Sequence, residues 1–112
     1  MAQELILKEK CKDMMKYGYQ AIRDIPRDYR YTLGADIRTS MMNLLQYIIR
    51  AGKKYYKKTT LEDMDIELDT LRTLIVVSVE NHVITVKEFQ HWSVLIDELG
   101  RMIGGWIKSV KN

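Results

Sequence analysis

The stretch from Thr85 to Val110 constrains the fold more than any other part of the chain. Its apolar residues recur alternately every three and four positions, which places one apolar stripe along a helix of roughly 25 residues, about 38 Å long. Thr85 and Glu88 have the spacing of a capping box, which predicts where this helix begins. A long helix with one apolar face has to pack against other elements that the same chain supplies. The stripe consists of Phe89, Trp92, Ile96, Leu99, Ile103, Trp106 and Val110.

Three glycines interrupt the second half of this segment. Gly100 and Gly104 lie four residues apart on one face, and Gly105 is beside them. Each glycine costs a helix roughly 1 kcal/mol relative to alanine. We therefore expect that they allow close approach of another helix, with Trp106 packed at the same site. The alternative is that they are merely tolerated on an exposed face.

Three further segments show the same periodicity, and we expect helices over about Glu4 to Arg23, Pro26 to Ala51 and Leu61 to Val79. Pro26 favours a turn after the first helix and suits the first turn of the second. Asp24 is a candidate cap for the second helix, and Thr59 or Thr60 for the third. The stripes are Leu7, Cys11, Met14, Gly18, Ile22 and Ile25; Leu33, Ile37, Met41, Leu44, Ile48 and Ala51; and Leu61, Met64, Leu68, Leu71, Ile75 and Ser78.

Four amphipathic segments with short connections predict an all-α protein, an antiparallel up-down four-helix bundle with one domain over residues 1–112. The second helix has more apolar residues than a small bundle requires, because Met42, Leu45 and Ile49 widen its stripe. These residues form either a wide core face or a second face that contacts another subunit.

The charges are distributed unevenly along the chain. The net charge is +3, but residues 1–58 hold 13 Lys or Arg and 6 Asp or Glu, whereas residues 59–112 hold 5 and 9. No uncharged stretch is long enough to span a membrane, and the N-terminus lacks the apolar core of a signal peptide. A single cysteine, Cys11, excludes an internal disulfide. We expect a cytoplasmic protein.

The strongest binding signal is the basic segment, residues 50–58, which combines five cations with two tyrosines. Its cations are Arg50, Lys53, Lys54, Lys57 and Lys58. Lysine and arginine neutralise phosphates, and tyrosine stacks on unpaired bases. This composition favours a nucleic-acid interface, and the alternative is a connection that charge keeps soluble.

The motifs that would indicate an enzyme are missing from the sequence. Glu88 and His91 form one Glu-x-x-His, whereas a di-iron bundle needs two such pairs and two more glutamates. His82 and His91 match no zinc ligand set, and no P-loop, dinucleotide-binding or Ser-His-Asp pattern occurs. We therefore predict a non-enzymatic protein without a metal or another cofactor.

Three segments together resemble the accessory variability determinant (Avd) proteins of diversity-generating retroelements. They are DIPRDYRYTLGADIR at 24–38, DIELDTLR at 65–72 and ELGRMIGGWIKS at 98–109. The related four-helix-bundle proteins encoded in intervening sequences of bacterial 23S rRNA genes begin their second helix similarly, so an oligomeric structural protein of that type is the alternative. The Gly-Gly-Trp ending favours Avd.

The resemblance implies a non-catalytic four-helix bundle that assembles as a pentameric barrel. It also implies binding to the element's reverse transcriptase and to RNA or DNA, in support of mutagenic retrohoming. The cations within the resembling segments, which become candidates for nucleic-acid binding, are Arg27, Arg30, Arg38, Arg72, Arg101 and Lys108.

Overall fold

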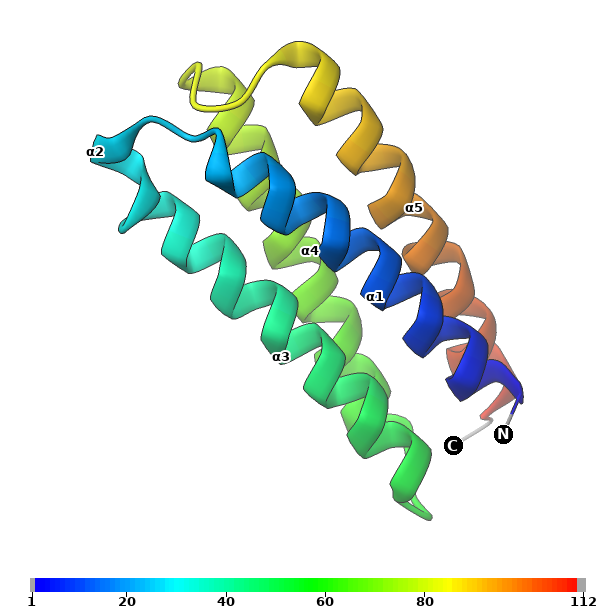
Figure 1. Ribbon diagram of the computed structural model, residues 1–112. Helices are drawn as coiled ribbons and strands as arrows, with labels where there is room; N and C mark the ends of the chain where they lie inside the picture. The colour runs from blue at the N-terminus through cyan, green and yellow to red at the C-terminus, as the bar shows by residue number, and fades with distance from the viewer. Residues whose placement is uncertain (1, 111–112) are drawn as a thin grey trace.

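The computed structural model describes residues 2–110, and within that range the chain is helical, with no strand. Four long helices lie side by side and alternate in direction (Figure 1). The molecule measures 43 × 22 × 20 Å. The predicted all-α bundle is therefore confirmed for one copy of the chain. The helices are α1 (Ala2–Arg23), the short α2 (Arg27–Arg30), α3 (Leu33–Lys53), α4 (Lys58–Glu80) and α5 (Val86–Ser109).

The helices pack as a square in which chain neighbours are also neighbours in space. α1 contacts α3 and α5, and α4 contacts the same two helices from the opposite side. The predicted stripes fill the centre, where all their residues are buried except Leu33, Phe89 and Val110, which are partly buried against the core. Gly18 and Ser78 are buried with the apolar residues of their stripes.

The start of α5 confirms the predicted capping box. The backbone N–H of Glu88 donates to Thr85 Oγ1 at 3.0 Å, and the backbone N–H of Thr85 donates to Glu88 Oε1 at 2.9 Å. These two bonds satisfy backbone donors that a helix N-terminus leaves without partners. The carboxylate of Glu88 therefore caps the N-terminus of α5.

The prediction of one continuous helix from Pro26 to Ala51 is wrong. Pro26 is the N-cap residue of a helix, but this helix, α2, ends after one turn and α3 begins at Leu33. Asp24 does not cap α2, which has no side-chain cap. Two side-chain bonds hold α2 in place: the Arg30 guanidinium donates to the Ile25 carbonyl in the turn before α2, at 3.3 Å, and Arg38 donates to the Arg30 carbonyl across the break, at 3.2 Å.

The start of α4 also differs from the prediction. The helix begins at Lys58, so Thr59 and Thr60 lie inside its first turn, and no side chain caps it. Thr60 is 3 % exposed, so it is a core position. The acidic residues from Glu62 onwards therefore follow the first turn, where their interaction with the helix dipole is weaker.

Candidate nucleic-acid interface

The basic segment, residues 50–58, forms one end of the bundle. It joins the last turn of α3 to the first turn of α4, at the end of the molecule where α1 begins and α5 finishes (Figure 1). Arg50, Lys53, Lys54 and Lys58 are exposed, and none of them belongs to an ion pair among the described residues. This segment therefore presents four charges that are free to meet an anion.

Lys57 has a different role from the other four cations. Its ammonium donates to the carbonyl oxygens of Ala51, at 2.6 Å, and Lys54. Carbonyl groups at the end of a helix lack intrahelical partners and carry partial negative charge, so a lysine there caps the helix. Lys57 thus holds the end of α3, and we separate it from the exposed cations.

Two tyrosines stand out from the same connection. Tyr55 is 88 % exposed and Tyr56 is 84 % exposed, and their rings meet edge to face with centroids 4.8 Å apart. An aromatic ring left in water offers a face on which an unpaired base can stack. The structure therefore brings the exposed cations of the basic segment together with two free aromatic rings.

The second set of predicted cations lies at the opposite end of α3. Arg30 and Arg38 are half-buried, whereas Arg27 is exposed. Arg30 donates to the Ile25 carbonyl in the turn before α2, and Arg38 donates to the Arg30 carbonyl across the break between α2 and α3. Arg30 and Arg38 also line an open pocket of about 470 Å³. Arg27, although close in sequence, does not line it.

Sequence reasoning missed two residues of this pocket. Arg23 and Tyr19 lie four residues apart on the last turns of α1 and line it together with Ile22. Their spacing places them on one helix face, and this spacing can be seen in the sequence. The other two arginines of the pocket are brought to this face by the break between α2 and α3, which we did not predict. The pocket therefore contains three arginines and a tyrosine.

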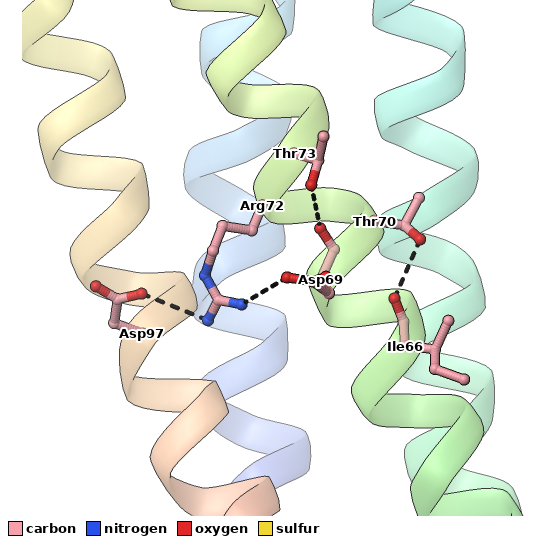
Figure 2. Close-up of polar contacts among 6 residues, drawn as sticks. All are labelled: Ile66, Asp69, Thr70, Arg72, Thr73 and Asp97. Carbon is pink, nitrogen blue, oxygen red and sulfur yellow. Dashed lines mark hydrogen bonds and ion pairs between the residues drawn. The ribbon is translucent and has the colours of Figure 1, made fainter.

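Arg72 is already neutralised by carboxylates. Figure 2 shows its guanidinium between Asp69 on α4 and Asp97 on α5, with each nitrogen–oxygen distance at 3.5 Å. Because both carboxylates hold Arg72 at the α4–α5 contact, its charge is less available to a phosphate. Arg101 and Lys108 are exposed on α5 and have no ion pair among the described residues.

Not every acidic residue of α4 is solvated. Glu67 accepts hydrogen bonds from Ser40 Oγ at 2.7 Å and from Asn43 Nδ2 at 3.3 Å, both on α3. Glu62, Asp63 and Asp65 are exposed instead, within the two turns that follow the basic segment. They lower the positive potential at that end of the bundle.

The glycines of α5 do not admit another backbone within one copy of the chain, so that prediction is wrong for the single bundle. A Cβ placed on Gly104 or Gly105 would meet nothing within 4 Å, and one on Gly100 would approach only the side chains of Arg72 and Leu68. Trp106 is 1 % exposed and belongs to the core of its own bundle. The glycines that do permit close packing inside the bundle are Gly18 on α1, against Met41 and Trp92, and Gly52 on α3, against the side chain of Glu4.

Two of the three extra apolar residues of α3 lie outside the core. Met42 and Ile49 are each 42 % exposed, and Leu45 is half-buried. Leu45 packs against the core, whereas Met42 and Ile49 form an apolar face beside it, which is open in the single chain. An open apolar face of this kind is typical of a surface that contacts another protein.

Three side chains with catalytic or metal-binding potential, Cys11, Glu88 and His91, have defined surroundings in the bundle. Burial raises the pKa of the Cys11 thiol to about 12, so the thiol stays protonated and is not an activated nucleophile. The His91 ring lies 4.3 Å from the Tyr17 ring, and Glu88 serves the capping box. Within residues 2–110, no three or more His, Cys, Asp or Glu residues are grouped to hold a metal ion.

The chain thus belongs, by its fold and its surface features, to the class of small helical bundles. It has an exposed basic end, a pocket lined by arginines and an open apolar face. A family model described as bAvd-like matches residues 5–110. The chain belongs to the bAvd-like family. No curated protein matches the chain. None of the helices in the described part has the length and apolarity that crossing a bilayer requires.

Proposed function

We propose that this chain is the non-catalytic accessory protein of a diversity-generating retroelement. In this role it binds the reverse transcriptase of the element together with its template RNA or DNA, and so supports mutagenic retrohoming. Membership of the bAvd-like family supports the retroelement role. The match also favours this role over that of a structural protein of the 23S rRNA intervening-sequence type.

One observation carries the nucleic-acid part of the proposal: the exposed cations of the basic segment are free of carboxylate partners and surround two exposed tyrosines. Cations neutralise phosphates and release counterions, whereas rings stack on bases of any sequence. Such a surface binds single strands with little sequence preference. The modest net charge of +3 and the nearby Glu62, Asp63 and Asp65 keep the expected affinity moderate.

Titration of the purified protein with a labelled single-stranded RNA tests this part. We expect binding that weakens steeply as salt rises, with a linear log–log dependence, because each phosphate contact releases a counterion. RNAs of unrelated sequence should bind alike. Failure of the protein to bind any strand at low salt would remove the nucleic-acid role and leave the polymerase as the proposed partner.

We further propose that the chain assembles as a homopentamer through the open apolar face of α3. Met42 and Ile49 remain partly exposed in the single chain, and burying them would remove apolar surface from water. Light scattering should give about 66 kDa, five times the chain mass of 13.2 kDa. A mass of 13.2 kDa at micromolar concentration would contradict this assembly.

A further inference from the structure

The pocket at the α2 end of the bundle brings three arginines together. Its lining comes from the last turns of α1, from α2 and from the start of α3, and it encloses about 470 Å³. That volume lies within the range of small-ligand pockets in proteins. Its residues are Tyr19, Ile22, Arg23, Arg30 and Arg38, so the lining has three positive charges and no carboxylate.

The three arginines are not neutralised by the protein. Among residues 2–110, the cations in ion pairs are Lys8, Lys10, Lys12 and Arg72. No arginine of the pocket is in that group. Three like charges around one pocket repel each other, and an anion placed between them would relieve the repulsion.

Two of the three guanidinium groups are held in place by neutral acceptors. Arg30 donates to the Ile25 carbonyl and Arg38 donates to the Arg30 carbonyl. Carbonyl acceptors fix the position of a guanidinium without cancelling its charge, and a guanidinium has five donors, so most remain available. The arrangement is therefore organised in advance for an acceptor with several oxygens.

We propose that this pocket binds one nucleotide unit, with the phosphate on the arginines and the base against Tyr19. Arginine matches phosphate geometry better than lysine does, and an aromatic ring in the same pocket suits a base. This choice of ligand rests on the proposed nucleic-acid role. An acidic peptide would satisfy the charge of the arginines but would leave the ring of Tyr19 without a specific partner.

A second pocket of about 300 Å³ continues from the first along α3. It shares Tyr19 and Arg38 and is otherwise lined by Thr39, Met42, Asn43 and Gln46. The same helix leads to Lys53, fifteen residues beyond Arg38, which is about 22 Å along the helix axis. The pocket and the basic segment therefore lie toward opposite ends of α3.

Four ligands and three single variants test the pocket in the full chain. The ligands, titrated separately, are adenosine 5′-monophosphate, inorganic phosphate, a single-stranded RNA and a glutamate-rich peptide. Arg23→Gln should weaken binding of both the nucleotide and phosphate by about tenfold, because a charged hydrogen-bond donor is lost. Tyr19→Leu should weaken binding of the nucleotide by about tenfold and leave phosphate unchanged, because only the base stacks.

Arg27→Gln is the matched control. It removes the same charge from an arginine that is also exposed at the same end of the molecule, but Arg27 does not line the pocket. We expect a change of less than about twofold, as for a screened surface charge. Circular dichroism of each variant confirms that the bundle is intact.

The pocket proposal would be overturned if Arg23→Gln and Arg27→Gln weakened nucleotide binding equally. It would also be overturned if the nucleotide did not bind, or if the glutamate-rich peptide bound to the pocket in its place. RNA binding that depends on the lysines of the basic segment but not on Arg23 would overturn the pocket and leave the proposed function standing. If the unaltered chain bound no RNA at all, the nucleic-acid role would be overturned. The mononucleotide titration would then still show whether the pocket binds a nucleotide.

Discussion

Replacing Lys53, Lys54 and Lys58 with glutamine will weaken binding of single-stranded RNA by about tenfold or more at low salt. The three lysines are exposed and have no carboxylate partner among the described residues. Each phosphate contact that is lost should also flatten the log–log salt slope by about 0.7 for a single strand. Lys57 stays in place, because its ammonium caps α3 and its loss would disturb the helix end.

A matched variant separates position from net charge. Replacing Lys12, Lys16 and Lys87 with glutamine also takes the net charge from +3 to 0, and these lysines are exposed on α1 and α5. We expect this control to retain most of the affinity and of the salt slope. If both triple variants weaken binding equally, the overall charge is responsible and the basic segment is not the interface.

Introducing leucine at two glycines will have opposite effects on the stability of the bundle. A Cβ on Gly18 would lie 2.6 Å from Met41 Sδ and 2.8 Å from Trp92 Cζ2, and both side chains are fully buried. Methionine can adjust, but the indole ring cannot move without displacing the core. Gly18→Leu should therefore cost about 3 kcal/mol or more, because the added atoms overpack the core. That cost corresponds to a melting temperature lower by about 12 °C.

Gly104→Leu is the counterpart with space around it. A Cβ at this position would meet nothing within 4 Å, so leucine should stabilise α5 by up to about 1 kcal/mol through helix propensity. Thermal melts at one protein concentration compare the two, and Gly18→Ala provides a milder variant if Gly18→Leu does not fold. If Gly104→Leu instead lowered the melting temperature and reduced the mass of the assembly, Gly104 would pack against a second copy of the chain.

The fold could be predicted from the sequence wherever one local pattern determines it. The stripe from Trp92 to Trp106 and the pair Thr85 and Glu88 depend only on spacing along one helix, and both predictions are confirmed. The break between α2 and α3 is spanned by side-chain bonds, from Arg38 to the Arg30 carbonyl and from Thr32 to the Asp28 and Tyr29 carbonyls. Local propensity contains no information about those bonds, so it predicts a continuous second helix.

For the candidate site, too, the sequence predicts what depends on local composition and does not predict what depends on contacts between helices. Composition alone identifies the exposed cations of the basic segment, but it cannot separate Lys57, which caps a helix, from its exposed neighbours. Nor can it show that Arg72 is held by Asp97, because that carboxylate comes from another helix (Figure 2). Pairing between helices decides which charges remain free, and it becomes visible only in the folded bundle.

Co-purification with the reverse transcriptase of the same element tests the central claim most directly. The tagged chain would be purified from cells that also produce the polymerase, treated with nuclease and analysed by size exclusion with light scattering. The proposed function predicts that the polymerase elutes with the chain in one complex, heavier than the assembly of the chain alone. A polymerase that elutes by itself, while the chain remains folded and assembled, would contradict it.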